Sequence, residues 1–151
     1  MYICVINSCK MFSKETEYAL RSLVYIQTQN SRRKRPGIDE ISREIEAPRF
    51  FTAKILHRMV RNGFIMSLKG KGGGFFFDMK KPELTLQELM NSTEGSSIIK
   101  SCGFGLKQCD CEHPCPLHEQ FSPIREALFK LVSTETIQSL AKKNGFSSKF
   151  K

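Results

Sequence analysis

The segment from Cys102 to His118 concentrates the residues that could bind a metal ion or react as nucleophiles. It holds four of the six cysteines and two of the three histidines in the chain. Two glycines and two prolines interrupt it, at positions 103, 105, 114 and 116, so we expect a surface loop and not a core element. Free cysteines usually serve packing inside a core. Cysteines gathered in a loop therefore indicate a binding or reactive site.

The spacing of these cysteines favours an iron–sulfur cluster over zinc and over thiol chemistry. A disulfide framework needs an oxidising compartment. The first residues of the chain lack the basic start and long apolar run of a secretory signal, so we expect reduced thiols in a cytoplasmic protein. Structural zinc favours closely spaced ligand pairs, which only Cys111 with Cys115 and Cys115 with His118 provide. The wider spacing of Cys102, Cys109 and Cys115 suits a cluster, in which histidine can replace cysteine on one iron. Zinc-bound and cluster-free loops stay open as alternatives.

A thiol oxidoreductase is the competing class of protein. Cys109-x-Cys111 would be its reactive pair, but such motifs belong to a βαβ context and need an organised base nearby. The pattern of the chain provides neither feature. We therefore expect no enzyme activity and no catalytic residues.

The composition indicates one soluble domain with a polyanionic partner. The chain has 151 residues, of which 40% are hydrophobic, enough for one ordinary domain. It has 24 Lys and Arg against 15 Asp and Glu, a formal charge of +9, which favours nucleic acid as the partner. No apolar run approaches the roughly 20 residues that cross a bilayer. A basic amphipathic helix with one broad apolar face would indicate a membrane surface, and the charges are spread differently, so no membrane partner is expected.

The first half of the chain shows the pattern of three helices, the last two forming a helix-turn-helix. The helices are expected from Ser13 to about Gln29, from Ile38 to Ala47 and from Arg49 to Arg61. The third has an apolar stripe, Phe51, Ile55, Leu56 and Met59, and basic residues on its other faces. Two short helices around a tight turn, the second one basic outside, indicate a helix-turn-helix. Its candidate DNA contacts are Arg49, Lys54, His57, Arg58 and Arg61.

A β-hairpin is expected directly after these helices. Residues 64–68 and 75–79 are rich in strand-forming residues, and residues 69–74 join them. A glycine-rich loop that binds nucleotide phosphates would need a helix after the glycines, whereas Phe75 begins a strand. The hairpin is therefore predicted to be a wing, with Ser67, Lys69, Gly70 and Lys71 as DNA contacts. The predicted fold class is mainly α with a small β-hairpin, a winged helix-turn-helix domain plus a C-terminal dimerisation helix.

The C-terminal part is expected to place the cysteine loop between two helices. A capping box from Thr85 to Glu88 starts a fourth helix that ends near Gly95. Ser122-Pro123 is expected to start the next helix. Its apolar stripe comprises Phe121, Ile124, Leu128, Phe129, Leu131 and Val132 and fits either a dimer interface or core packing. Thr134 is expected to cap a last helix that carries Ile137 and Leu140.

The predicted organisation has five parts. Residues 1–10 are expected to be a non-structural extension, since Met11 opens the first patterned segment. The parts that follow are a winged helix-turn-helix domain (11–95), a cysteine-rich sensor loop (96–120), dimerisation and terminal helices (121–143) and a flexible tail (144–151).

The order of these elements resembles the bacterial IscR/NsrR-type family of winged-helix transcription regulators. The resemblance covers about Met11 to Leu140, and it is carried by four motifs. These are the opening helix from Met11 to Arg21, the recognition helix and turn from Lys54 to Ile65, the wing from Ser67 to Phe75, and Cys115-Pro-Leu-His118. The wing resembles the family pattern Ser-x-Arg-Gly-x-x-Gly-Gly-Tyr, with Lys69 in place of Arg. Lysine lacks the planar fork suited to a narrow minor groove, so a softer sequence preference is expected there.

The resemblance implies a homodimer that binds an inverted-repeat operator in double-stranded DNA. It also implies sensing of iron–sulfur, nitric oxide or redox status through a cluster, often [2Fe–2S], although the family contains members without one. Cys102, Cys109 and Cys115 match the three cluster-binding cysteines of the family.

The fourth ligand of such a cluster has three candidates. His118 matches the histidine of one branch of the family, and Glu17 stands where another branch places an acidic ligand. Cys111 has no counterpart in the family pattern. We prefer His118 because it follows Cys115 closely in the chain, whereas Glu17 must be brought in by tertiary or cross-subunit contact.

Overall fold

A computed structural model describes residues 11–95, 102, 104–107 and 111–143 of the chain. The predicted extension (1–10), the predicted tail (144–151) and Cys109 lie outside the described residues. The elements are α1 (Lys14–Ser31), α2 (Ile38–Glu44), α3 (Arg49–Arg61), β1 (Met66–Leu68), β2 (Gly74–Phe76), α4 (Leu86–Thr93), α6 (His118–Thr134) and α7 (Ile137–Lys142). This confirms the predicted fold class, mainly helical with one small antiparallel hairpin. No helix among the described residues is long and apolar enough to cross a bilayer.

Helix α1 is the centre of the fold. It begins after Ser13, whose hydroxyl accepts the Thr16 N–H at 3.3 Å, the side-chain cap expected for serine at this position. Helices α2, α3, α4 and α7 and strand β2 all pack against it. The core that they enclose contains Leu23, Ile26, Ile41, Ile45, Ile55, Leu56, Met59, Ile65, Leu89, Met90, Val132 and Ile137. The helix-turn-helix is therefore fixed on one side of α1.

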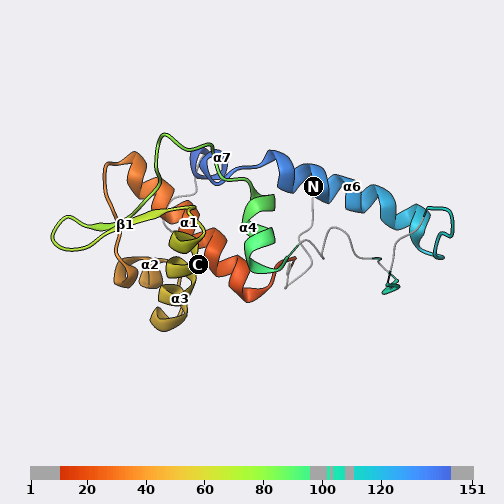
Figure 1. The fold of residues 1–151 in the computed structure, drawn as a ribbon, viewed down its shortest axis with the longest axis horizontal. Coiled ribbons are helices and arrows are strands. Elements are labelled where there is room, and N and C mark those ends of the chain that lie inside the picture. Colours follow the sequence, from red (N-terminus) through yellow and green to blue (C-terminus); the bar gives the residue numbers. More distant parts are fainter. Residues whose placement is uncertain (1–10, 96–101, 103, 108–110, 144–151) are drawn as a thin grey trace, which may run out of the picture.

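The hairpin β1–β2 projects from one end of the molecule (Figure 1). Its strands pair antiparallel, with Met66 opposite Phe76 and Leu68 opposite Gly74. They are shorter than predicted because the Phe77 N–H donates to Asn30 Oδ1 on α1, at 3.0 Å, and so leaves the ladder. The base of the hairpin is held by the segment before α2, where the Phe75 N–H donates to the Pro36 carbonyl at 2.9 Å. The wing is thus anchored to the core at its base while its tip projects.

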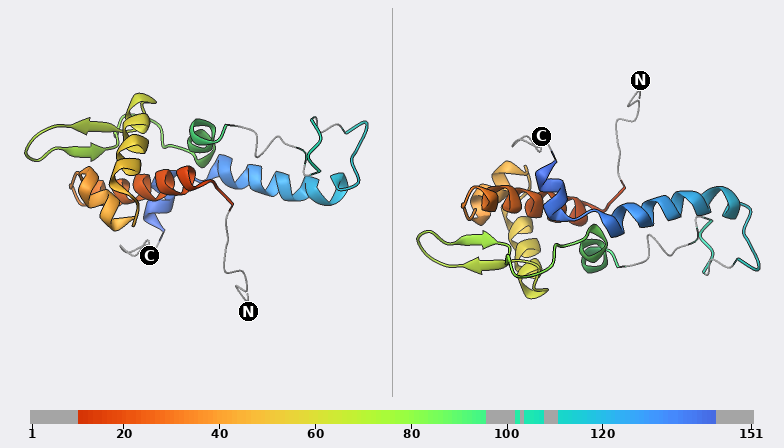
Figure 2. Two further views of the ribbon diagram at one scale, coloured as in Figure 1. Left: turned by 90° about the horizontal axis from the view of Figure 1, so that it is seen from below. Right: turned by 90° about the horizontal axis from the view of Figure 1, so that it is seen from above.

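Helix α6 extends as an arm at the end opposite the hairpin, as both views of Figure 2 show. Its C-terminal end packs on α4 and contributes Val132 to the core. The junction between α6 and α7 is tied to the segment before α4. The Leu86 N–H donates to the Glu135 carbonyl at 3.0 Å, and the Ile137 N–H donates to the Leu84 carbonyl at 2.8 Å. One end of the arm is therefore fixed to the DNA-binding domain.

Two predicted helix starts are wrong. Helix α6 begins at His118 and not at Ser122-Pro123, and Pro123 lies inside it. Pro123 is the sixth residue of α6, beyond the first turn in which proline costs no helical bond, so the carbonyl of Glu119 lacks its usual helical donor. Glu119 is exposed, and water can bond to that carbonyl. Thr136, not Thr134, caps α7, with Ser139 completing a capping box.

Candidate functional site

The outer face of α3 is an exposed surface that combines cations with an aromatic ring. The inner face buries Thr52, Ile55, Leu56 and Met59 against the core. On the outer face, Lys54, His57 and Arg61 are exposed. Phe50 is 83% exposed, beside the half-buried Ala53. A helix with one apolar inner face and one cationic outer face beside a wing has the arrangement of a recognition helix.

Two of the predicted DNA-contact arginines form ion pairs within the chain. Arg58 is half-buried and pairs with Glu15 on α1, so its guanidinium faces the core of the domain. Arg49, which is exposed, pairs with Asp39 on α2. The Arg58 pair joins the recognition helix to α1, which favours a positioning role for Arg58 over a phosphate contact. An exposed pair such as that of Arg49 is weak, so Arg49 stays available to a phosphate.

The tip of the wing adds a second cationic surface. Ser67, Lys69, Gly70 and Lys71 are all exposed, as expected for groups that reach into a groove. Gly70 has a φ of 88°, a conformation that glycine adopts without strain. The glycines thus let the chain turn tightly enough to present both lysines at the tip.

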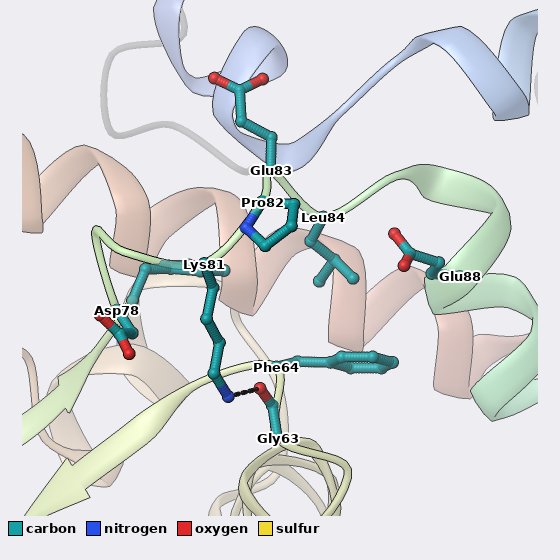
Figure 3. Close-up of a pocket in the computed structure, with 9 residues that line it drawn as sticks. Gly63, Phe64, Asp78, Lys81, Pro82, Glu83, Leu84 and Glu88 are labelled. Carbon is teal, nitrogen blue, oxygen red and sulfur yellow. Dashed lines mark hydrogen bonds between the residues drawn. The ribbon is translucent and has the colours of Figure 1, made fainter.

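The return from the wing is locked to the end of α3, as Figure 3 shows. The Lys81 ammonium donates to the Gly63 carbonyl at 2.8 Å. This contact lies in a pocket of about 140 Å³ that is also lined by Phe64, Leu84 and Glu88. Such a volume is small for a ligand site. The hydrogen bond and the side chains around it instead fix the wing relative to the recognition helix.

The described part of the cysteine loop brings two of the predicted ligands together. The Cys102 thiol donates to the Cys115 sulfur, with 3.7 Å between the two Sγ atoms. Cys102 is buried and Cys115 half-buried. Backbone N–H groups of Phe104 and then Leu106 point at the Cys102 sulfur and lower the pKa of that thiol below its ordinary value. Stabilised thiolates are the form that binds metals.

The remaining candidate ligands are placed differently. His118 is the first residue of α6, and its N–H donates to the Cys115 carbonyl at 2.9 Å. Cys111 is exposed. Glu17 lies on α1 and pairs with Lys14 at 3.1 Å. The described loop residues lie toward the far end of α6, away from α1 (Figures 1 and 2). Within one chain His118 is thus next to the sulfur pair, and Glu17 is not.

The sulfur pair fits a bound metal or cluster. Two sulfurs on one tetrahedral metal ion, with bonds of about 2.3 Å, lie roughly 3.8 Å apart, close to the 3.7 Å between Cys102 and Cys115. No group of three or more Cys, His, Asp or Glu side chains is already assembled among the residues that the structure describes. The third predicted cysteine, Cys109, is not among them. Two of the candidate ligands are therefore close enough to share one metal ion, and their sulfur donors are chemically suitable.

Residues 12–143 match the family model Rrf2, described as an iron-dependent transcriptional regulator. The chain belongs to the Rrf2 family. Members of this family are transcriptional regulators and not enzymes; they bind DNA and are typically dimeric. This confirms the resemblance found in the sequence and the expectation that the chain is not an enzyme.

Several relatives match this Rrf2 protein along most of its length. Protein aau3 of Rhizobium meliloti is 30% identical over 132 residues, which cover 86% of this chain and 84% of that protein. The transcriptional regulator NsrR of Bacillus subtilis is 24% identical, covering 84% of this chain and 87% of NsrR. Among solved structures, CymR, the global cysteine regulator of B. subtilis, matches with a TM-score of 0.70 at 17% identity. This match covers 87% of this chain and 96% of CymR. IscR of T. potens matches with a TM-score of 0.65 at 12% identity, covering 89% and 88%. These structures share the winged-helix fold.

One surface residue of this Rrf2 protein was missed by the sequence analysis. Phe50 is the second residue of α3 and lies outside the stripe that was used to predict the helix. Each residue of a helix advances by about 100°, so Phe50 lies opposite the core-facing residues Ile55 and Met59. The helical spacing places this aromatic residue on the polar side of α3, and that position is the signal in the sequence that could have identified it.

Proposed function

We propose that this protein is a homodimeric transcription regulator whose operator binding is controlled by an iron–sulfur cluster in the cysteine loop. Cys102, Cys109 and Cys115 would hold the cluster, with His118 as the fourth ligand. The cluster type proposed is [2Fe–2S]. The partner is an inverted-repeat operator, contacted by α3 and by the wing.

The observation that carries this proposal is the sulfur pair of Cys102 and Cys115, 3.7 Å apart. The backbone N–H groups around Cys102 favour its thiolate form, as cluster ligation requires. A bound cluster supplies a centre that responds to oxidants, nitric oxide or iron supply. Binding or loss of the cluster would change the conformation of the loop. That change would pass to α6, because the loop leads directly into this helix at His118.

Helix α6 gives the loop a route to the DNA-binding face. Its N-terminal end adjoins the sulfur pair, and its C-terminal end is bonded to the segment before α4. Its exposed apolar residues include Ile124 (62%), Phe129 (47%) and Leu131 (43%). Core packing therefore accounts for Val132 and not for these three. We infer that they form the dimer interface, so that a change in the loop alters the relative placement of the two winged domains.

A cluster-free thiol switch is the second candidate, since sulfurs 3.7 Å apart need little movement to form a disulfide. The two thiols would lose two electrons and two protons to an oxidant such as hydrogen peroxide, which is reduced to water. A zinc-bound loop is the third candidate. Both would keep the DNA-binding function and change only the signal.

Anaerobic purification tests these alternatives. A cluster is expected to give red-brown protein with visible absorption and about two iron and two sulfide per chain for [2Fe–2S]. Operator affinity should change when the cluster is removed. Colourless protein that contains zinc, or that contains neither metal nor sulfide, would contradict the cluster.

A further inference from the structure

We propose that Phe50 recognises a thymine in each operator half-site through the 5-methyl group of the base. Phe50 would then help to determine which sequence this regulator binds. The proposal rests on the DNA-binding role of α3 described above and adds a residue and a base to it.

The exposure of Phe50 is the first step of the argument. Its side chain is 83% exposed, while Phe51, the next residue, stacks edge-to-face on Tyr18 of α1 with 5.8 Å between ring centroids. Phe50 is therefore not needed for the packing of α3. Exposure of one apolar residue is ordinary by itself, so the surroundings of the ring decide whether a partner covers it.

The surroundings of Phe50 identify that partner. The ring borders a shallow hollow of about 600 Å³ that is also lined by Ala53, Lys54, His57, Val60 and Arg61. At about 100° per residue, Lys54 and Arg61 lie on one side of Phe50 along the helix, and Ala53 and Val60 lie on the other. The wing adds Lys69 and Lys71. The cationic side complements a nucleic acid backbone, and the apolar side leaves room for an apolar group next to it.

The position of Phe50 in α3 indicates which chemical group of the DNA its ring would contact. Residues near the N-terminus of a recognition helix contact base edges in the major groove, and Phe50 is the second residue of α3. The apolar group that base edges present there is the 5-methyl of thymine, which phenylalanine and alanine side chains contact. Ala53, three residues further along α3, lines the same hollow, but its methyl group is too short to replace the contact of the ring.

The test begins with selection of an operator from random duplex DNA by the wild-type protein. Each selected thymine is then replaced by deoxyuridine, which lacks only the 5-methyl group. At one thymine per half-site, we expect the wild-type affinity to fall about fourfold, or about fifteenfold when both half-sites are changed, as expected for loss of one buried methyl at each. Phe50→Ala should bind the thymine operator as weakly as the wild type binds the deoxyuridine operator, and should not distinguish the two.

Two further variants control for indirect effects. Phe50→Leu keeps an apolar side chain and should retain most of the discrimination. Met79→Ala removes another exposed apolar side chain, 88% exposed and outside α3, and should keep the wild-type ratio.

The possible failures are distinguishable. If the wild type enriches no duplex, the DNA-binding proposal fails together with this one. If an operator is selected but thymine and deoxyuridine bind equally at every position, this inference alone is overturned. It is also overturned if Phe50→Ala keeps the discrimination, or if it changes only the association state of the protein, which would assign the ring to a protein contact.

Discussion

Cys102 and Cys115 are thirteen positions apart, yet their sulfurs make direct contact. The loop therefore brings these two candidate ligands together, and backbone N–H groups favour the thiolate of Cys102. Cys111, by contrast, is exposed. At the scale of single residues, the proposed sensor depends on which of these thiols is held in place.

Replacing Cys102 or Cys115 with alanine is expected to abolish the visible absorption of protein purified without oxygen. Each change removes one thiolate from the sulfur pair, and the remaining ligands are too few for a stable cluster. Cys111→Ala is the matched control and should leave absorption, iron and sulfide nearly unchanged. Bleaching by Cys111→Ala together with an unaffected Cys115→Ala would refute the proposed ligand set.

Replacing His118 with alanine is expected to weaken or retune the cluster without affecting the fold. A neutral imidazole in place of a thiolate makes a cluster less negative and raises its reduction potential, so a replacement ligand should shift that potential. Redox titration followed by visible absorption measures the effect. Glu17→Ala is the comparison. If Glu17→Ala bleaches the protein and His118→Ala does not, the fourth ligand comes from α1 of a partner subunit.

At the scale of the elements, the wing depends on one close approach between two backbones. Gly74 has a φ of 139°, and a Cβ atom there would lie 2.3 Å from the Arg35 carbonyl oxygen. Gly74→Ala is therefore expected to displace the hairpin from the segment before α2. We expect a loss of about 1–3 kcal/mol in the free energy of unfolding, measured by urea denaturation, and weaker operator binding.

Gly37→Ala is the matched control for the wing. Gly37 caps α2 at a φ of −90°, and nothing lies within 4 Å of a Cβ built there. Its replacement should leave operator affinity unchanged and alter stability only slightly. Equal effects of the two substitutions would show that the close approach at Gly74 does not hold the wing.

The joint between α1 and α4 is expected to make stability depend on pH through Glu94. The Ser13 N–H donates to Glu94 Oε1 at 2.6 Å. Burial raises the pKa of Glu94, but hydrogen bonds from the Thr16 and Ser13 hydroxyls and from the Ser13 N–H outweigh it, and the net pKa lies below the ordinary 4.5. The charged form is therefore favoured in the folded state.

Glu94→Gln should lower the free energy of unfolding by about 1 kcal/mol at neutral pH, a modest value because the carboxylate is partly exposed. The stability that a lowered carboxyl pKa provides is fully present above the unfolded pKa and is lost as pH falls through the folded pKa. The difference from the wild type should therefore shrink below about pH 4.5. A difference independent of pH would exclude this origin.

Elements whose signals are local could be predicted from the sequence. The Ser13 cap and the Thr85–Glu88 capping box are both formed, and the apolar stripe of α3 gave its bounds. The start of α6 could not be predicted, because Leu117 has no side chain that caps a helix. The Arg58–Glu15 ion pair joins two helices, and no local pattern indicates it. The exposure of Phe50 depends on the same tertiary placement.

At the scale of the whole molecule, the two functional ends lie far apart. The wing projects at one end and the described cysteine loop lies at the other, with α6 between the loop and the core (Figure 1). In the proposed function, a signal in the loop would reach DNA through α6 and through the packing of two subunits. Half-sites of an inverted repeat lie about 34–36 Å apart, so a small rotation of the arms is enough to lose one of them.

Ile124→Asp is expected to convert the dimer into a monomer. Ile124 is 62% exposed in the single chain, so the change should not disturb the fold, which circular dichroism can verify. In a symmetric interface the charge appears twice, and each lost apolar contact contributes about 1.5–3 kcal/mol. Sedimentation should show a dissociation constant at least a hundredfold weaker. The operator footprint should shrink to one half-site, and binding should be weaker but fall less steeply with salt, because fewer phosphate contacts release fewer counterions. Met79→Asp adds the same charge at an exposed position outside α6 and should leave the dimer intact. A stable Ile124→Asp dimer would show that α6 does not form the interface and that the loop must reach the DNA-binding domain by another route.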